Sequence, residues 1–445
     1  MRITKIASST VIIEFNDIKI LSDPWIEDGE YYGSWCLMQD IDKEKAYLHM
    51  NSCDYIFLSH IHPDHMSKKT LKNINKNIKI IIHKFASPYV KKNLDALGFK
   101  NVIELNHGEI FKLNNNVKIE IYAADDCNPK ICKKIMGCNY DTDQIGKNSH
   151  QIDTCSLVYD QKHKILNLND CHVNLMENTI SRIVAKHKSI DYLLINYSSA
   201  HSYPQCIENL SIQKKIEESN KLKNLSFKYS EKYLQLVKPK YFIPFAGEYY
   251  IGGKFSDYNN YYGVNNQNEC FEYFSKSKFK NQLLMINYGN SFTEGYKNNF
   301  KILSKNKIEK KILNISRVKY DYENDVYPDK ESIIDKLEKA SNNLYSKMKI
   351  MNIKFNENIA IKFFNNYFKL DLYNLTNKVY ENKKDLLNEK ITILKLDERL
   401  LAKILLGPRY AHWNNADIGS HIIYEKINIL NYNYKLFNTI SYFHN

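Results

Sequence analysis

Long apolar runs are missing from this chain of 445 residues. No stretch approaches the roughly 18 uninterrupted apolar residues that a membrane-spanning helix needs. The first residues, 1–5, lead into a β-strand pattern without the apolar core of a signal peptide. These absences predict a cytoplasmic protein without a membrane partner.

Paired cysteines are missing as well. The nine cysteines are an odd number and are scattered along the chain, which argues against a disulfide framework and indicates buried thiols. Cys127, Cys132 and Cys138 lie near one another in a predicted loop, but they form no C-x-x-C pair. Buried thiols are therefore the favoured interpretation of this cluster over a metal site.

Acidic residues are the minority among the charges. The 63 Lys and Arg outnumber the 50 Asp and Glu, which gives a net charge of +13. The lysines are spread through Lys-, Asn-, Ile- and Tyr-rich segments such as residues 305–311, whereas a nucleic-acid surface needs them concentrated on one face. We therefore do not expect a nucleic-acid partner, although the charge suits an anionic small-molecule substrate.

Short β-rich runs alternate with helical patterns through the first 300 residues. Residues 10–15 and 18–21 predict a hairpin with Asn16-Asp17 at its turn, and residues 55–58 predict a buried strand. Further strands are predicted at 80–82, 102–105, 117–123, 154–159, 164–168, 192–195 and 241–244, and helices at 68–76, at 175–186 and before 237. This alternation predicts an α/β (α+β) fold, a four-layer αββα sandwich over residues 1–300.

Residues 301–445 predict a second, smaller α+β domain, for which a sterol-carrier-like module is one candidate. Its predicted elements are a helix at 329–348 and strands at 359–364 and 367–372. Asp417 and His421 are four residues apart and would share one face of a helix. We favour a structural or interdomain role for this pair.

Residues 59–66 hold the densest group of metal-binding side chains, an H-x-H-x-D-H motif directly after a predicted strand. A divalent metal needs several imidazoles or carboxylates that converge on one point. His60 and His62 alternate in an extended segment, so both side chains can point toward one metal. Asp64 and His65 follow a proline and face a second position. The motif therefore predicts two neighbouring metal ions.

This pattern resembles the metallo-β-lactamase superfamily. The resemblance implies that His60, His62 and His150 bind the first metal, that Asp64 and His65 bind the second, and that Asp170 bridges both. The superfamily's final His is missing, because the expected region reads Pro244-Phe245-Ala246-Gly247-Glu248. The second metal site would therefore be weaker, open, or completed by Glu248 or His201.

A narrower resemblance is to the metal domain of CMP-N-acetylneuraminate hydroxylase, from Asp23 to about residue 270. The segments that carry it are Asp23-Pro24-Trp25, residues 58–65, His150 through Asp153-Thr154-Cys155, residues 163–167, Asp170-Cys171, Lys238-Pro239-Lys240 and residues 244–247. The Rieske ligand pairs C-x-H and C-x-x-H, which accompany that domain, are absent from the sequence. An oxygenase built this way would need a separate electron donor.

The resemblance implies an iron-dependent oxygenase that modifies a nucleotide-activated sugar of the CMP-nonulosonic acid type. The cofactors would be two divalent metal ions, with iron favoured and zinc or manganese as alternatives. The alternative is a hydrolase of a phosphoester, lactone or amide, in which Asp64 and Asp170 position a metal-bound hydroxide. In either case Asp64 and Asp170 are the expected catalytic residues. A binding module without activity is a third interpretation, prompted by the missing His.

Two further features of the sequence each allow two interpretations. Asp23 at the exit of the hairpin either orients a ligand His from outside the metal shell or caps a turn. The aromatic residues Trp25, Tyr31, Tyr32 and Trp35 lie in the following loop. We favour packing for these rings over stacking on a base or sugar.

Overall fold

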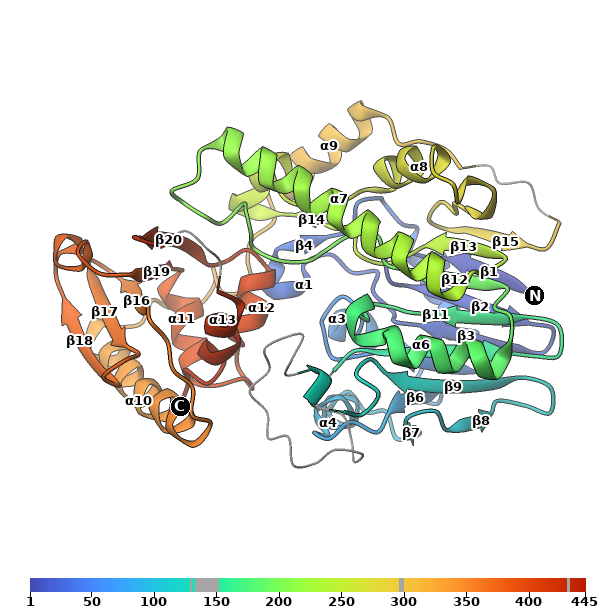
Figure 1. Cartoon of the computed structure of the whole chain (residues 1–445), viewed down its shortest axis with the longest axis horizontal. Coiled ribbons are helices and arrows are strands. Elements are labelled where there is room, and N and C mark those ends of the chain that lie inside the picture. Colours follow the sequence, from blue (N-terminus) through green and yellow to red (C-terminus); the bar gives the residue numbers. More distant parts are fainter. Residues whose placement is uncertain (129, 133–151, 296–299, 430–432) are drawn as a thin grey trace.

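The computed structural model describes residues 1–128, 130–132, 152–295, 300–429 and 433–445. Figure 1 shows a larger part that holds two sheets and a smaller C-terminal part with a sheet of its own. Among the described residues, no helix is both long enough and apolar enough to cross a membrane.

The first sheet has seven strands, and its last four run parallel to one another. In order across the sheet, the strands are β15 (Asn290–Thr293), β1 (Arg2–Lys5), β2 (Val11–Phe15), β3 (Ile18–Ser22), β5 (Tyr55–Leu58), β6 (Lys79–His83) and β7 (Val102–Leu105). The predicted hairpin is confirmed as β2 and β3, which pair antiparallel across a turn at Asn16 and Asp17. A central strand such as β5 is buried along its whole length, as expected for a parallel strand covered on both faces.

The second sheet has six strands, of which three are parallel neighbours. In order they are β13 (Tyr241–Pro244), β12 (Tyr192–Ile195), β11 (Lys164–Asn167), β10 (Thr154–Tyr159), β9 (Lys118–Ala123) and β8 (Ile110–Lys112). A separate two-stranded sheet joins β4 (Trp35–Cys36) to β14 (Tyr250–Ile251). All the strands predicted for this part of the chain are present.

Side chains that alternate along each strand separate the layers. Ile13 and Ile121 belong to the apolar core between the two sheets, whereas Ile12 packs in the cluster under the outer helices. The outer helices are α2 (Lys43–Asn51) and α4 (Tyr89–Ala96) on the first sheet, and α6 (Val173–His187) and α7 (Ile212–Val237) on the second. The predicted four-layer αββα sandwich is therefore confirmed (Figure 1).

The C-terminal part is a five-stranded sheet with helices on one face. Its strands, in order, are β18 (Thr376–Tyr380), β17 (Asn366–Asp371), β16 (Asn358–Phe363), β19 (Ile391–Lys395) and β20 (Ile423–Ile427). Its helices are α10 (Lys330–Ile350), α11 (Glu398–Leu405), α12 (Trp413–Ile418) and α13 (Tyr434–Ile440). The predicted helix and both predicted strands are present, while the likeness to a sterol-carrier module stays a prediction.

The two parts share packing along the chain segments that join them. Helix α9 (Lys305–Ile315) packs through Ile308 and Ile312 against the apolar cluster under the first sheet. In return, Cys206 and Ile207 of the larger part lie in the C-terminal core, and the backbone N–H of Tyr424 donates to the Cys206 carbonyl at 2.9 Å. The division at residue 300 stays a prediction.

Short helices complete the chain. They are α1 (Glu30–Gly33), α3 (Lys68–Leu71) and α8 (Gln267–Ser275), with 3-10 turns η1 (Gly253–Asn260), η2 (Lys280–Gln282) and η3 (Lys383–Leu386). The predicted helix over residues 68–76 is shorter than expected, because only its first turn is helical. The prediction that Asp417 and His421 share a helical face is wrong, because α12 ends at Ile418.

The loop between β3 and α2 is filled with buried aromatic rings. Trp25 and Trp35 are 0% and 1% exposed, and the ring of Trp35 stacks on that of Tyr249. Tyr31 is also buried, at 3% exposed. The structure thus assigns Trp25, Tyr31 and Trp35 to packing, as the favoured interpretation held.

The loop between β3 and α2 packs closely against the segment around Tyr320, and Gly33 lies at the contact. Its φ is +98°, and a Cβ there would lie 2.9 Å from Tyr320 Cα. Gly98 has a similar φ of +91°, but nothing lies within 4 Å of a Cβ there. We predict that Gly98→Ala costs about 1 kcal/mol for its left-handed backbone. Gly33→Ala should cost about 2 kcal/mol more for the clash.

Thermal unfolding followed by circular dichroism checks this prediction. The Gly33→Ala midpoint should lie several degrees below that of the matched Gly98→Ala variant. Equal midpoints would show that the loop and the Tyr320 segment do not pack as closely as described.

Candidate metal centre

The carboxyl ends of the parallel strands deliver the first group of polar side chains. Strands β3 and β5 are parallel neighbours, so the residues that follow them, Asp23 and Ser59, emerge at the same edge of the sheet. The backbone N–H of Asp23 donates to the Phe57 carbonyl at 3.0 Å, which extends the pairing to that edge. The H-x-H-x-D-H motif begins at this point, and the side chain of His60, its first residue, is 0% exposed.

The second sheet brings Asp170 to the same place. Two hydrogen bonds cross between the sheets there: Thr154 Oγ1 donates to the Ser59 carbonyl at 2.6 Å, and Asn167 Nδ2 donates to Ser22 Oγ at 3.0 Å. Asn167 ends β11, and Asp170 follows it after a turn. The two strand ends therefore bring residues from distant parts of the sequence into one cluster.

Two groups of potential metal ligands form in this cluster, and they share Asp170. The first is His60, His62 and Asp170, and the second is Asp64, His65 and Asp170, with the ligand atoms of each group within 4.8 Å of one another. His60 Nε2 lies 3.8 Å and His65 Nε2 lies 3.1 Å from Asp170 Oδ2. This arrangement agrees with the prediction of two metal positions joined by a bridging carboxylate.

Asp23 and Ser59 determine which nitrogen of each ring faces the cluster. Asp23 Oδ2 accepts from Ser59 Oγ at 2.7 Å and from His65 Nδ1 at 2.9 Å. Because the Ser59 hydroxyl proton points to Asp23, its oxygen accepts from His60 Nδ1, at 2.9 Å. Both Nδ1 atoms thus carry protons, and in the neutral form of each ring the Nε2 atom presents a lone pair inward. The contact predicted between Asp23 and a ligand His is confirmed.

The charges of the cluster call for a cation. Burial lowers the pKa of His60 well below its usual value, and the neighbouring rings of His65 and His62 lower it further. Burial acts in the same direction on His65, but the carboxylates of Asp170 and Asp64 outweigh it and raise the pKa of His65 well above its usual value. A positive charge at His65 Nε2 is therefore favoured, whether a proton or a metal ion supplies it.

The residues fit a bound metal ion. His65 Nε2 is buried and has no hydrogen-bond partner, although carboxylate oxygens of Asp64 and Asp170 lie 3.3 Å and 3.1 Å away. A buried nitrogen lone pair beside two anionic oxygens is unfavourable unless a cation lies between them. Nitrogen and oxygen donors of this kind suit iron, zinc and manganese.

One predicted ligand lies outside the described residues, and two predicted replacements are wrong. His150 falls in the segment 133–151, so its position is not described. Glu248 instead accepts from Gln267 Nε2 at 2.9 Å and from Tyr288, within a buried polar network. His201 Nδ1 is bonded to the Tyr203 carbonyl at 2.8 Å. Among the residues that the structure describes, neither Glu248 nor His201 joins a ligand group.

Sequence comparison places this centre in a known superfamily. Residues 2–182 match the family described as Beta-lactamase superfamily domain. This part of the chain is a β-lactamase superfamily domain. The match includes Asp23, the whole H-x-H-x-D-H motif and Asp170, so the prediction of a superfamily of metal-dependent enzymes is confirmed.

Curated relatives match a little over half of the chain. A protein of Mycobacterium tuberculosis, named as a putative Rieske 2Fe-2S iron-sulfur protein, is 22% identical over 56% of this chain and 44% of its own length. The cytidine monophosphate-N-acetylneuraminic acid hydroxylase of Danio rerio is 22% identical over 55% of this chain and 38% of its own length. The chain thus spans less than half the length of these relatives.

Solved structures show more distant likeness. An isothiocyanate hydrolase from Delia radicum gut bacteria is 13% identical with a TM-score of 0.44, and covers 66% of this chain and 99% of its own. CmlA, a diiron beta-hydroxylase from Streptomyces venezuelae, is 12% identical with a TM-score of 0.39, and covers 60% of this chain and 48% of its own.

Several residues that contact the predicted ligands escaped the sequence analysis. Asn196 Nδ2 donates to Asp170 Oδ1 at 2.7 Å, and Tyr31 donates to Asp64 Oδ1 at 2.6 Å. Asp153 Oδ1 lies 3.9 Å from His60 Nε2. Asn196 directly follows β12, the parallel neighbour of β11, and that position was a readable signal. Tyr31 gave none, because an irregular loop places it.

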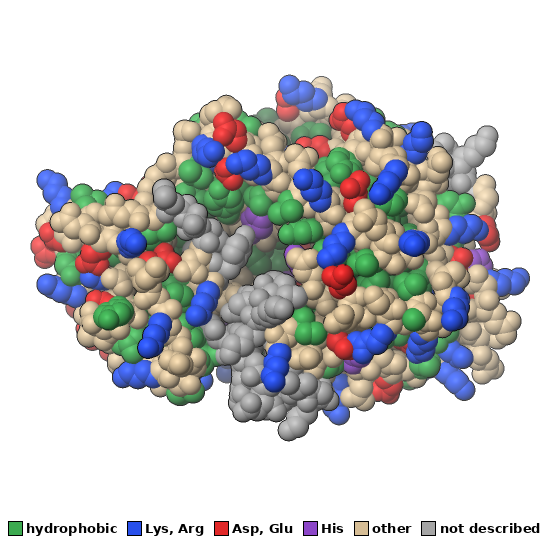
Figure 2. All heavy atoms as spheres, viewed as in Figure 1, with side chains coloured by type: hydrophobic (Ala, Val, Ile, Leu, Met, Phe, Trp, Pro, Cys, Tyr) green, Lys and Arg blue, Asp and Glu red, His purple; other side chains and the backbone are tan. Residues whose placement is uncertain are grey.

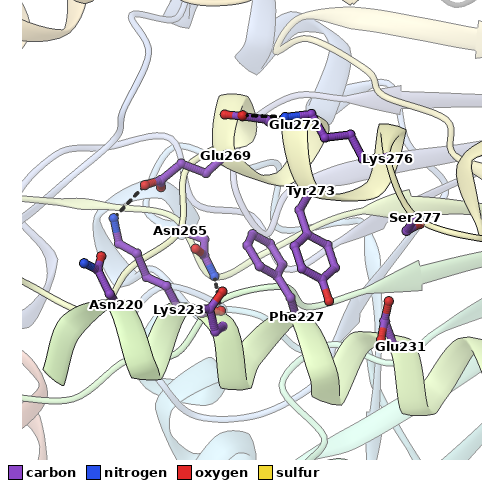
Figure 3. A pocket seen from close by; sticks show the side chains of 11 residues that line it. Asn220, Lys223, Phe227, Glu231, Asn265, Glu269, Glu272, Tyr273, Lys276 and Ser277 are labelled. Carbon is purple, nitrogen blue, oxygen red and sulfur yellow. Dashed lines mark hydrogen bonds and ion pairs between the residues drawn. The ribbon is translucent and has the colours of Figure 1, made fainter. Parts of the chain in front are cut away.

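A large surface groove lies elsewhere in the larger part of the molecule. It is about 710 Å³ in volume and lies between α7 and α8 (Figure 3). Its walls include the stacked rings of Phe227 and Tyr273 and the ion pair between Lys223 and Glu269, at 2.7 Å. None of the metal-ligand residues lines it. The donor geometry, and not the size of this groove, therefore locates the chemistry.

Asp23 offers a test of the centre that leaves every proposed metal ligand in place. Both carboxylate oxygens of Asp23 are acceptors, because Oδ1 accepts the backbone N–H of Ser59 at 2.8 Å and Oδ2 accepts from Ser59 Oγ and His65 Nδ1. In Asp23→Asn the amide NH₂ replaces one of these oxygens and faces a donor in either orientation. Because outer partners of this kind orient ligand imidazoles, we predict that the affinity for the second metal ion falls by about 10–100-fold. Asp54→Asn is the matched control, since exposed Asp54 only accepts the backbone N–H of Lys19.

Competition of the purified apoprotein against a metal-chelating dye measures this affinity. Equal dissociation constants for Asp23→Asn and Asp54→Asn would contradict the assigned role of Asp23.

Proposed function

We propose that this chain is an iron-dependent oxygenase that hydroxylates a nucleotide-activated sugar of the CMP-nonulosonic acid type. The observation that carries the proposal is the composition of the two ligand groups. One group has two His and one carboxylate, the other has one His and two carboxylates, and neither contains a thiolate. Two His and one carboxylate with open positions is the donor set of non-haem iron oxygenases.

The side chains of the centre would each do a defined task. Bound iron would supply the redox chemistry that activates dioxygen. Asn196 holds the carboxylate of Asp170 by its 2.7 Å hydrogen bond, and this fixes the oxygen shared by both groups. Tyr31 holds Asp64 in the same way, at 2.6 Å. Because His60 and His65 are 0% exposed, the ligand nitrogens are closed off from bulk water on the protein side.

The overall reaction needs a source of electrons. One oxygen atom of dioxygen would enter a C–H bond of the sugar, and the other would leave as water with two electrons and two protons. The described residues and the sequence contain no Rieske ligand pair, so we propose that a separate reductant supplies the electrons. The hydroxylase name of the Danio rerio relative supports the choice of substrate class.

The proposed entrance for the substrate is a hollow in the surface beside the C-terminal part (Figure 2). Figure 2 shows the surface hollowed between the C-terminal part and the rest of the molecule, with histidine side chains visible inside. On the same face, Lys and Arg side chains are dispersed among acidic and uncharged ones. This spread fits an anionic small molecule better than a long nucleic acid.

Oxygen consumption tests the proposal. The iron-loaded protein, supplied with a chemical reductant and CMP-N-acetylneuraminate, should consume oxygen and yield a product heavier by one oxygen atom in mass spectrometry. Asp170→Asn removes a shared anionic ligand and should lower the rate by at least about 100-fold. Asp257→Asn, at an exposed position, should leave the rate unchanged.

A hydrolase would give a different result. Release of acid from a phosphoester, lactone or amide by the zinc- or manganese-loaded protein, without oxygen consumption by the iron-loaded form, would overturn the oxygenase proposal in favour of hydrolysis by a metal-bound hydroxide.

A further inference from the structure

The C-terminal part touches the metal centre at its first ligand group. Asn414 lies on α12, and its Nδ2 is 3.4 Å from Nε2 of His62. His62 Nδ1 faces the opposite way, 3.0 Å from His60 Nε2. The outer nitrogen of this ligand ring therefore meets a side chain that lies 352 residues later in the chain.

A second contact leads to the other ligand group. His421 Nδ1 accepts from the Tyr322 hydroxyl at 3.1 Å, so its Nε2 carries the proton and donates to the backbone carbonyl of Tyr31 at 2.7 Å. Tyr31 in turn donates its hydroxyl to Asp64 at 2.6 Å. His421 is 2% exposed and Tyr31 is 3% exposed, so this chain of contacts is shielded from solvent.

Further hydrogen bonds hold the two surfaces together between these contacts. The backbone N–H of His412 donates to Tyr32 Oη at 2.7 Å, and Trp35 Nε1 donates to the Ile418 carbonyl at 3.2 Å. Figure 1 shows α12 beside α1, the helix that carries Tyr31 and Tyr32. The C-terminal part is thus attached both to His62 and to the loop that carries Tyr31.

We propose that Asn414 and His421 are positioning residues of the metal centre, so that the C-terminal part strengthens metal binding at both sites. Asn414 holds the ring of His62 in the first group. His421 holds Tyr31, and through it the carboxylate of Asp64 in the second group. The inference rests on the metal centre of the proposed function, but not on the oxygenase reaction.

The chemistry of His62 explains why an amide suits position 414. Its Nδ1 lies 3.0 Å from His60 Nε2, so a metal ion held by both rings would use the Nδ1 lone pair, and the proton would be on Nε2. Rotating the Asn414 amide by 180° brings Oδ1 to the position of Nδ2, where it accepts this proton. A hydrogen bond to the outer nitrogen fixes the ring and makes it a better ligand.

Cobalt binding tests the role of Asn414. Titration of the full-length apoprotein with Co²⁺, followed by its visible absorption, should resolve two binding events in the wild type. Asn414→Ala should weaken one of them by about 10-fold and leave the other unchanged. Asn414→Asp keeps an acceptor oxygen and should restore the wild-type affinity. Asn382→Ala, an exposed position of the same C-terminal part, should change neither event.

A double-mutant cycle tests the role of His421. Tyr31→Phe removes only the hydroxyl that holds Asp64, and His421→Ala removes the contact to the Tyr31 carbonyl. Each should weaken the Co²⁺ binding event that Asn414→Ala leaves unchanged. The double variant should weaken it by less than the product of the two single effects, because both act through Tyr31. Circular dichroism identifies any variant that fails to fold, in which case His421→Gln replaces His421→Ala.

The outcomes separate this inference from the proposed function. If the wild type binds two Co²⁺ ions and Asn414→Ala binds them equally well, the inference fails while the metal centre stands. The same holds if the effects of Tyr31→Phe and His421→Ala multiply fully. A wild-type protein that binds no metal ion would overturn both.

Discussion

The structure depends on one electrostatic constraint, the approach of buried imidazole nitrogens to buried carboxylates. His65 Nε2 lies 3.1 Å from Asp170 Oδ2, and it has no hydrogen-bond partner. Asp23 fixes the proton of this ring on the far side, at Nδ1. Because the lone pair of His65 Nε2 would then point at anionic oxygens, the cluster is stable only around a positive charge. The fold brings these groups together, and a metal ion would make that arrangement favourable.

The two-sheet architecture explains how residues far apart in the sequence meet there. Parallel strands place the residues that follow them at one edge of each sheet, and cross-sheet bonds such as that of Thr154 to Ser59 align the two edges. Among the described residues, neither sheet alone supplies a complete ligand group, because each group combines the motif after β5 with Asp170 after β11. Packing between the sheets is therefore also the assembly of the metal centre.

The sequence predicted the strands, the layers and the densest part of the site, because hydrophobic alternation and the H-x-H-x-D-H motif are local patterns. It identified the contact of Asp23 with a ligand His through its place at a strand end. It missed Tyr31 and Asn414, whose positions depend on an irregular loop and on packing between distant segments. The four-residue spacing of Asp417 and His421 led to a wrong prediction of a shared helical face, because α12 ends at Ile418, before His421.

The most direct test of the account is the crystal structure of the iron-loaded protein, with anomalous scattering measured at the iron absorption edge. The account predicts two iron peaks about 3.5–4 Å apart, one beside His60 and His62, one beside Asp64 and His65, with Asp170 bound to both. A single peak, or peaks that Asp170 does not bridge, would contradict the shared-carboxylate centre on which the proposed function rests.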